Sequence, residues 1–421
     1  MRSQIEGSQA VARAVALARP QVICAYPISP QTHIVESLSA LVQSGELTGC
    51  EYLNVESEFA AMSAAIGASA AGARAYTATA SQGLLFMVEA VYNASGLGLP
   101  IVMTVANRAI GAPINIWNDH SDAMSQRDSG WIQLYAEDNQ EAVDLHLQAF
   151  RLAEEVSLPV MVCMDGFVLT HAVEEVDLPE SEVVDQFLPP YEPRQILDPA
   201  EPVSIGAMVG PEAFLEVRYL AHVRQMQALE VIPTIAREFG AATGRERNGL
   251  VSQYRMEDAV IAIVALGSVI GTLKDAVDEL RADGVRVGVL GITSFRPFPI
   301  DAVRQALAGV TDVVVLEKAL AVGIGGIVSA NVRTALAGQD HRTVTVIAGL
   351  GGRPILKSSL AQMITNARAG ELPELSFLDL RRDLVERELA RARAERRSGP
   401  AAENILRDIA DTGTHQGGRP R

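Results

Sequence analysis

The sequence predicts an α/β protein with two doubly wound parallel sheets, followed by a C-terminal helical extension. Short apolar runs alternate with helical stretches in two separate regions, and an acidic, proline-rich segment lies between these regions. Apolar strands separated by helices are typical of a parallel sheet that helices cover on both faces. The chain has 421 residues, which is more than one ordinary domain holds, so two domains are expected.

The first domain is predicted over residues 1–178. Its expected strands lie in five apolar runs: PQVICAY (20–26), EYLNV (51–55), RAYTATA (74–80), LPIVMTVA (99–106) and LPVMVCM (158–164). Residues 57–72, 82–95 and 139–156, between these runs, have helical patterns. The first twenty residues show the pattern of an amphipathic helix and lack the uninterrupted apolar core of a secretory signal.

A connector is predicted over residues 179–257, followed by a second domain over 258–370 and a charged helical tail over 371–421. Residues 179–202 are acidic and proline-rich, so they are expected to be extended, and a long helix is expected over 210–240. The second domain is a smaller doubly wound unit with expected strands at 259–267, 285–292, 312–317 and 343–349. In the tail, a solvated helix over 381–397 and a frayed end from residue 412 are expected; a partner-wrapping arm is the alternative.

Composition narrows the class of protein. Hydrophobic residues make up 48% and charged residues 20% of the chain, which is typical of a soluble globular protein. The net charge of −16 disfavours nucleic-acid binding, because a phosphate backbone would be repelled. Cys24, Cys50 and Cys163 form no CxxC pair, so no local metal cluster or structural disulfide is expected. No stretch is long and apolar enough to span a bilayer, and a cytoplasmic location is expected.

Polar or turn residues follow all five expected strands of the first domain. In an open parallel sheet, ligands bind outside the carboxyl ends of the strands. Each group is a weak signal by itself, but together they predict one site at this edge. The groups are Tyr26–Pro30, Glu56–Glu58, Ser81–Gly83, Asn107–Arg108 and Asp165–Gly166.

Three of these residues have alternative interpretations. Arg108 is either a fork for a carboxylate or phosphate or, as its position alone favours, a surface ion-pair partner. Glu58 is either a helix-start carboxylate or a carboxylate at an apolar interface that shares a proton with a ligand nitrogen. Small residues around Glu58 allow close packing by another subunit, which slightly favours the second interpretation. Ser29 is a hydroxyl donor on the rim or a turn residue between two prolines.

Three further segments have compositions that suggest ligand sites. The polar loop 116–131 contains carboxylate, amide and imidazole groups, but it lacks standard ligand spacing, so a hydrogen-bonded interface loop is favoured over a metal site. The glycine-rich segments 320–332 and 349–354 lack a phosphate-loop lysine and the GxGxxG spacing. Packing glycines are therefore the favoured interpretation, and no metal site is predicted.

Several long strings, in order along the chain, resemble the α subunit of the 2-oxoacid:ferredoxin oxidoreductase family, pyruvate synthase type. The similarity runs from about Glu6 to Gly370, and its motifs are highly specific because so many occur together. The strings are AYPISPQT (25–32), the stretch from Glu56 to Met103, the stretch from Asn107 to Gln133, MDGFVLTH (164–171), FLPPYEP (187–193) and SFRPFPIDAV (294–303).

The resemblance implies that this chain is one part of an enzyme and is inactive alone. The first domain looks like the pyrimidine-binding domain of thiamine diphosphate enzymes, and the second like a transketolase C-terminal domain. In the family, a β subunit holds the diphosphate and its magnesium, a ferredoxin-like subunit carries iron–sulfur clusters, and a γ subunit completes the assembly, expected as a dimer of hetero-oligomers. The chain lacks a GDG-type diphosphate motif and a cysteine cluster, which agrees with this division.

The resemblance also implies residue roles. Glu58 matches the glutamate that bonds the aminopyrimidine ring of thiamine diphosphate and promotes loss of the thiazolium proton. Ser81 and Gln82 are expected at the cofactor, and Arg108 matches the arginine that pairs with the substrate carboxylate. Ser29 stands where the pyruvate enzymes have threonine, and the missing methyl group leaves more room beside the substrate.

The room beside Ser29 and an arginine-rich, lysine-poor composition favour phenylglyoxylate as the 2-oxoacid. The product would be benzoyl-CoA, and a flavoprotein subunit with FAD would pass the electrons to NAD. The alternative is pyruvate, which gives acetyl-CoA and reduces ferredoxin. Less favoured hypotheses are a non-redox thiamine transferase subunit and a non-catalytic scaffold.

Overall fold

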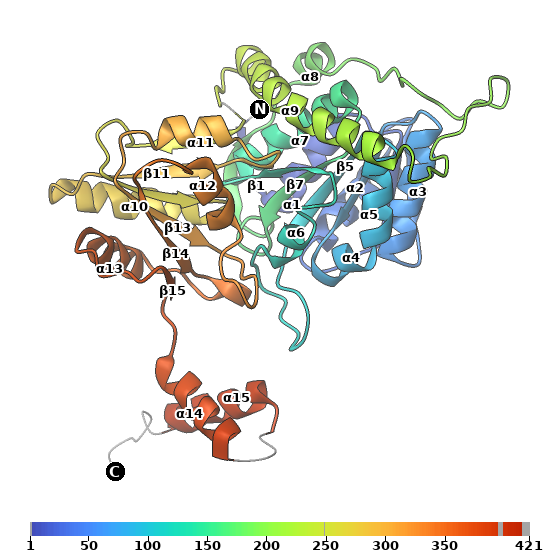
Figure 1. The fold of residues 1–421 in the computed structure, drawn as a ribbon. Helices are drawn as coiled ribbons and strands as arrows, with labels where there is room; N and C mark the ends of the chain where they lie inside the picture. The colour runs from blue at the N-terminus through green and yellow to red at the C-terminus, as the bar shows by residue number, and fades with distance from the viewer. Residues whose placement is uncertain (1, 248, 395–398, 415–421) are drawn as a thin grey trace. The chain divides into compact units, whose positions relative to one another are not determined.

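The chain folds into an α/β structure with two parallel sheets that lie side by side in the compact unit Met1–Ser376 (Figure 1). Phe377–Arg421 form a second unit. The computed structural model describes residues 2–247, 249–394 and 399–414. The predicted fold class is confirmed, whereas the bounds of the four predicted segments stay a prediction.

The first sheet has seven strands in the order β12-β6-β7-β5-β4-β2-β3. Every neighbouring pair from β6 to β3 is parallel, and β12 is antiparallel to β6. The carboxyl ends of the parallel strands therefore lie at one edge. The strands are β2 (Val22–Ala25), β3 (Glu51–Asn54), β4 (Ala75–Thr79), β5 (Ile101–Asn107), β6 (Ile132–Tyr135), β7 (Val160–Asp165) and β12 (Ser294–Arg296).

Helices cover both faces of this sheet, and this arrangement explains the unbroken apolar runs of its strands. In β5, Val102 belongs to one buried cluster, while Ile101, Met103 and Val105 belong to the other, because successive side chains point to opposite faces. One face packs against α1 (Gly7–Leu17), α2 (Thr32–Ser44) and α7 (Asn139–Val156), and the other against α3 (Glu58–Ala70), α4 (Ser81–Phe86) and α5 (Val88–Gly96).

The second sheet is also doubly wound. Its strand order is β15-β14-β13-β10-β11-β9; β9 is antiparallel to β11, and β14, β13, β10 and β11 are parallel. Helices α10 and α13 pack together on one side and α11 and α12 on the other (Figure 1). The elements are β9 (Val251–Tyr254), β10 (Ile261–Ala265), α10 (Val269–Ala282), β11 (Val287–Ile292), α11 (Ile300–Ala306), β13 (Asp312–Glu317), α12 (Val328–Ala335), β14 (Arg342–Ile347), η1 (Leu350–Gly352), α13 (Lys357–Arg368) and β15 (Leu375–Phe377).

The two sheets are joined by β12, which follows β11 of the second sheet but pairs with β6 at the edge of the first. Ser294 lies opposite Leu134, and Arg296 lies opposite Gln133. The Tyr135 N–H donates to the Thr293 carbonyl at 2.8 Å, which extends the pairing by one step. The buried cluster on this side runs continuously from the first sheet into the second.

The prediction of a helix over the first twenty residues is wrong in part. Residues 2–6 form β1 (Arg2–Glu6), which pairs antiparallel with β8 (Val173–Asp177), and α1 begins only at Gly7. A Cβ on Gly7 would lie 2.1 Å from the Leu169 carbonyl oxygen. The chain can therefore turn from strand to helix against this carbonyl only where no side chain is present.

The start of the connector was predicted to be extended, but α8 (Ser181–Phe187) forms within it. Phe187 is buried and lies edge-on to Phe239 of the long helix α9 (Phe214–Thr243), with ring centroids 5.1 Å apart.

The single helix predicted over 82–95 is instead two helices, α4 and α5, which meet at Met87. Strands β6, β9, β12 and β15 were not predicted either.

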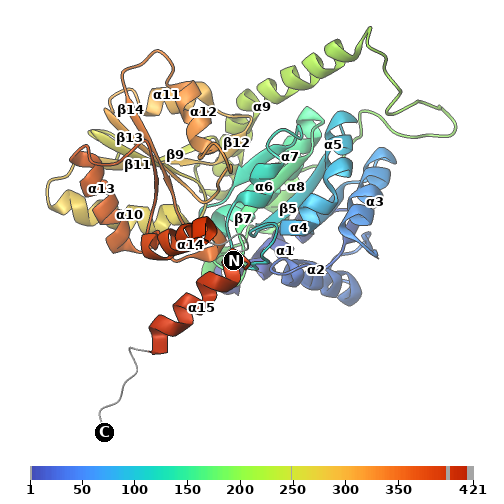
Figure 2. The same ribbon diagram turned by 60° about the horizontal axis from the view of Figure 1, so that its bottom comes forward.

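Figure 2 shows the N-terminal half of α9 and the loop before it extending away from both sheets. This half carries exposed apolar side chains, among them Leu215, Tyr219 and Leu220. The second unit contains α14 (Arg382–Ala394) and α15 (Ala401–Thr414), so the tail is helical through Thr414; the rest of the expected frayed end, 415–421, lies outside the described residues. Among the helices described, none is long and apolar enough to cross a membrane.

Candidate active site

The strand ends that the sequence singled out lie at one edge of the first sheet. Asn107 pairs with Asp165 at the ends of β5 and β7, and the Gly166 N–H donates to the Asn107 carbonyl at 3.0 Å. The turn after β2 reaches the same place, because Arg108 Nη1 donates to the Ser29 carbonyl at 2.9 Å. A Cβ on Gly166 would lie 2.5 Å from a ring carbon of Pro30, so these two turns are in direct contact.

Arg108 is buried, so it does not form the surface ion pair that its position in the sequence had favoured. Its side chain is held by two carbonyls, that of Ser29 and that of Asn115, the latter 3.2 Å from Nε. Within the described parts of the chain, no carboxylate pairs with its guanidinium and Nη2 forms no hydrogen bond. Burial lowers the pKa of Arg108, and the nearby Asp122 carboxylate opposes this effect. A fixed cation with free donors suits an anionic ligand.

Asp122, from α6 (Ser121–Ser125), fixes the backbone on which Arg108 stands. Its Oδ2 accepts from the N–H groups of Ser81 and Arg108, both at 2.9 Å, and its Oδ1 accepts from Asn107 Nδ2 at 2.8 Å and the Ala123 N–H at 2.7 Å. Burial raises its pKa to about 6 despite these donors. The carboxylate thus joins the ends of β4 and β5.

Glu58 is the first residue of α3, and its side chain has no hydrogen-bond donor among the described residues. Ser57 caps the helix by accepting from the Ala60 N–H at 3.2 Å, so Glu58 is not needed as the cap. Glu58 is only 8% exposed. A buried carboxylate without a donor is costly, unless a ligand supplies the hydrogen bond.

Gly83 and Thr79 border the Glu58 carboxylate. A Cβ built on Gly83 would lie 2.7 Å from Glu58 Oε1 and 2.6 Å from Thr79 Oγ1, so any side chain there would displace both. Thr79 Oγ1 is buried and has no hydrogen-bond partner in the part of the chain that the structure describes. The bare Cα of Gly83 thus allows the carboxylate and the hydroxyl to lie close together, where both can bond a ligand that carries nitrogen donors. Thr79 was missed because it sits inside an apolar run, where nothing in the sequence marks it.

Ser81 and Gln82 lie beside this group at the start of α4. Ser81 is fully buried with φ of +49°, a left-handed conformation that is uncommon for residues other than glycine. Its hydroxyl is bonded to the Ala109 carbonyl and to Gln82 Oε1. Gln82 is half-buried, and its Nε2 lies 3.4 Å from the Gly111 carbonyl. Their role at a cofactor stays a prediction.

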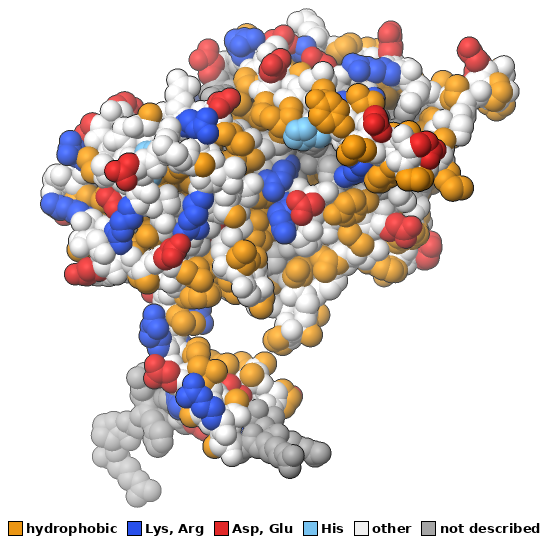
Figure 3. Space-filling view, in the orientation of Figure 1, with side chains coloured by type: hydrophobic (Ala, Val, Ile, Leu, Met, Phe, Trp, Pro, Cys, Tyr) orange, Lys and Arg blue, Asp and Glu red, His pale blue; other side chains and the backbone are white. Residues whose placement is uncertain are grey.

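Exposed apolar side chains lie on β3, on α3 next to Glu58, and on α4 and α5. We call the surface formed by Leu53, Phe59, Phe86, Val88 and Tyr92 the apolar surface; all five are 39–61% exposed, and the rings of Phe59 and Phe86 are 6.4 Å apart. Figure 3 shows further hydrophobic side chains gathered over α9, beyond α5. Contiguous exposed apolar surface of this kind marks an interaction site.

The glycine-rich segments are packing elements, as the sequence favoured. Glu317 accepts from the N–H groups of Ile327, Val328 and Ser329 at 2.7–2.8 Å, so its carboxylate already occupies the N-terminus of α12. A phosphate would be repelled there. The second segment docks on the polar loop, because Gly351 donates to Asp119 Oδ2 at 3.0 Å.

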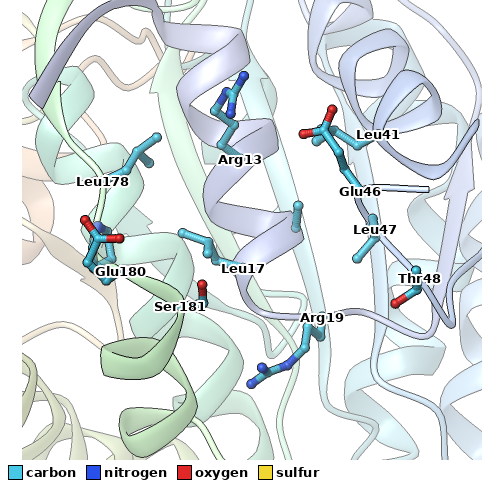
Figure 4. A pocket seen from close by; sticks show the side chains of 12 residues that line it. Arg13, Leu17, Arg19, Leu41, Glu46, Leu47, Thr48, Leu178, Glu180 and Ser181 are labelled. Carbon is cyan, nitrogen blue, oxygen red and sulfur yellow. The ribbon is translucent and has the colours of Figure 1, made fainter. Parts of the chain in front are cut away.

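The polar loop is therefore a hydrogen-bonded interface between the two sheets, as was favoured over a metal site. No group of three or more His, Cys, Asp or Glu side chains that could hold a metal ion occurs in the described parts of the chain. A separate groove of about 390 Å³ lies between α1, α2 and the start of the connector (Figure 4). Arg13, Leu17, Leu41 and Glu180 line it, and none of the predicted site residues does.

Comparison with known proteins places these features in a family. The model described as pyruvate flavodoxin/ferredoxin oxidoreductase, thiamine diphosphate-binding, matches residues 13–237, and that of the pyruvate:ferredoxin oxidoreductase core domain II matches 259–359. The chain is 48% identical over 390 residues to the pyruvate synthase subunit PorA of Methanosarcina barkeri, covering 90% of this chain and 97% of that relative. It is 45% identical to the PorA of Thermotoga maritima, with coverages of 90% and 98%.

A more distant relative is the ketoisovalerate oxidoreductase subunit VorA of Pyrococcus abyssi, 40% identical with coverages of 86% and 92%. Among solved structures, the 2-oxoglutarate:ferredoxin oxidoreductase from Magnetococcus marinus has the same fold, with a TM-score of 0.66 at 19% identity. The match covers 87% of this chain and 65% of that one. Because one family model spans more than half of the chain and relatives at 40–48% identity match along nearly all of it, the chain belongs to the pyruvate flavodoxin/ferredoxin oxidoreductase family.

Proposed function

We propose that this chain is the α subunit of a thiamine diphosphate-dependent enzyme that oxidatively decarboxylates pyruvate with CoA, giving acetyl-CoA and CO2. The observation that carries the proposal is the buried carboxylate of Glu58 beside Gly83 and Thr79, to which no described residue donates a hydrogen bond. It lies at the same sheet edge as the buried cation of Arg108. A proton-exchanging carboxylate and an anion-binding guanidinium are the two groups that this chemistry needs from the chain.

Pyruvate is proposed in place of phenylglyoxylate, which the sequence had favoured. The relatives matched along nearly their whole length are named for pyruvate and, at lower identity, for ketoisovalerate, and both are aliphatic 2-oxoacids. No relative reported above is named for an aromatic 2-oxoacid. The room that Ser29 leaves beside the substrate therefore supports phenylglyoxylate less strongly than these names support pyruvate.

The residues present fit the aminopyrimidine part of thiamine diphosphate. Glu58 Oε1 would bond a ring nitrogen and move a proton at that oxygen, and Thr79 Oγ1 would accept from or donate to the ring. Gly83 lets Glu58 and Thr79 pack against the start of α4 beside this position, since a Cβ there would meet both side chains. When bound, the cofactor supplies the electron sink that allows CO2 to leave a 2-oxoacid.

Arg108 would bind the substrate carboxylate through its free Nη2 donors. Its other donors are already held by Ser29 and Asn115, so the guanidinium is oriented before the substrate arrives. Preorganised charge costs little reorganisation during the reaction. The Ser29 hydroxyl is exposed on the same turn, where it would face the substrate.

Partner subunits would complete the active site. The matched relatives are named as subunits, and the apolar surface has the character of an interface. A thiamine diphosphate-binding β subunit that holds magnesium would cover this surface, and iron–sulfur subunits would accept the two electrons that leave the substrate and pass them to ferredoxin. A γ subunit is expected in the same assembly, and a flavoprotein that passes electrons to NAD is the less favoured alternative.

Glu58→Gln in the assembled complex is expected to lower turnover by roughly 10²–10⁴-fold, because an amide cannot exchange the proton. Glu56→Gln is the matched control, since Glu56 is exposed two residues earlier. The measurement is 2-oxoacid-dependent formation of acyl-CoA. Equal turnover in the two variants would remove Glu58 from the mechanism.

Arg108→Ala is expected to raise the KM for pyruvate about 100-fold, since charge-assisted hydrogen bonds contribute roughly 3 kcal/mol. The control is Arg127→Ala, whose side chain is 38% exposed on the polar loop. Steady-state kinetics at saturating CoA measures both variants. An unchanged KM with a lowered melting temperature would mean that Arg108 only stabilises the fold.

The KM for pyruvate is expected to rise as pH falls below about 6, the pKa to which burial raises Asp122. Protonation would place a hydroxyl against N–H groups that now donate to Asp122, including that of Arg108. In Asp122→Asn, the KM should be high at every pH and insensitive to this range. Asp128→Asn, in the same loop with a side chain 68% exposed, should keep the parental profile.

The decisive experiment is a substrate panel on the native complex, with pyruvate, 2-ketoisovalerate and phenylglyoxylate compared by kcat/KM. Pyruvate is expected to have the highest value, with ferredoxin reduced as acyl-CoA forms. A preference for phenylglyoxylate would restore the sequence-based substrate prediction. Pyruvate-dependent transfer without ferredoxin reduction would favour the non-redox transferase, and no turnover would favour a scaffold.

A further inference from the structure

A buried cluster of four side chains connects the second sheet to the candidate active site. We call it the Asp165 cluster; its members are Asp165 at the end of β7, His120 before α6, Ser268 before α10 and Lys318 after β13. Asp165 is 1%, His120 2% and Lys318 6% exposed. No motif in the sequence marks Lys318 or Ser268.

Asp165 is the acceptor for all the other members. Lys318 Nζ lies 2.8 Å from Oδ2, His120 Nε2 lies 2.7 Å from Oδ1, and the Ser268 N–H donates to Oδ2 at 3.0 Å. The Ser268 hydroxyl also donates to Oδ2. The backbone N–H of His120 in turn donates to the Lys318 carbonyl at 2.7 Å, which closes the network.

The two sheets approach each other closely at this cluster. Gly267, at the end of β10, has φ of +73°, and a Cβ there would lie 3.0 Å from His120 Nε2 and 3.2 Å from Asp165 Oδ2. A side chain would therefore push the second sheet away from β7. Burial opposes ionisation of Asp165, but the Lys318 ammonium and the His120 ring outweigh it and hold the pKa of this carboxyl well below its usual range.

Asp165 leads directly to the substrate side of the proposed site. The next residue, Gly166, bonds the Asn107 carbonyl and touches Pro30, and Arg108 follows Asn107 in the chain. Movement of the β7 end would therefore displace both the Ser29 turn and the backbone of Arg108. Glu58 and Thr79 lie at the ends of other strands, and within the described ranges no hydrogen bond joins them to Asp165.

We propose that Lys318 is a positioning residue through which the second sheet sets the geometry of the 2-oxoacid-binding turns at Ser29 and Arg108. The ammonium balances the buried carboxylate, so removing it leaves Asp165 to move or to admit water. The inference rests on the proposed function in assigning a 2-oxoacid to these turns. The three lysines of the chain, Lys274, Lys318 and Lys357, provide the comparison.

The test compares Lys318→Met, Lys318→Arg and Lys357→Met in the complex assembled with its partner subunits. Lys357 forms an exposed ion pair with Glu279, so its variant is the matched control. Lys318→Met is expected to raise the KM for pyruvate by roughly 10–100-fold, because misplacing a binding group by about 1 Å costs on this scale. The KM for CoA should change by less than about twofold, and Lys318→Arg should recover part of the loss.

A second readout does not depend on activity. Amide hydrogen exchange in Lys318→Met should increase at residues 26–31 and 107–111, but not in α3, and it should be unchanged in Lys357→Met. If Lys318→Met does not assemble, Asp165→Asn combined with Lys318→Met removes both charges and should still raise the KM for pyruvate and the exchange at both turns. Parental KM and exchange in whichever variant folds would overturn the proposal.

The two proposals can fail separately. A parental complex that turns over no 2-oxoacid would reject the proposed function, whereas increased exchange at the two turns would still support the role of Lys318. An active complex in which Lys318→Met lowers the melting temperature, with unchanged KM for pyruvate and unchanged exchange at the turns, would make the cluster a structural contact and reject the inference.

Discussion

The candidate site depends on the hydrogen bonds that the Asp122 carboxylate accepts. Strand ends in a parallel sheet have backbone N–H groups without ladder partners, and burying them is costly unless each finds an acceptor. Asp122 accepts from the ends of β4 and β5 and from the start of its own helix. The same bonds hold Ser81 in its left-handed conformation and support Arg108. Burying a carboxylate is thus the cost of joining two segments with different proposed tasks, one toward the cofactor and one toward the substrate.

The division of tasks follows from the fold. The α3 and α4 side presents Glu58 and exposed aromatic side chains, and it is incomplete without a covering surface. The β5 and β7 side is completed within the chain, because the second sheet closes it through Asp165 and Asp119. Under the proposed function, one half of the site would therefore depend on another subunit and the other half on this chain's own second sheet.

The sequence predicted the parallel sheets and the edge at which Ser29, Glu58 and Arg108 lie, because apolar runs and the rule for strand ends are local signals. It did not predict that Arg108 is buried, since that depends on Ser29 and Asn115 from other segments. The strand β1 was missed because its partner β8 lies about 170 residues away, and the pairing outweighs the helical pattern. Thr79 and Lys318 were missed for the same reason: their neighbours are distant in sequence and nothing in their local composition marks them.

The strand β12 has an evolutionary consequence. Because Ser294–Arg296 fill the edge of the first sheet, the two sheets are not interchangeable modules, although each has its own set of helices. A gene fission between them would leave β6 with unpaired backbone groups along an open edge, which is a template for aggregation. Rearrangements within such proteins are therefore expected to keep these two regions on one polypeptide and to place new junctions elsewhere along the chain.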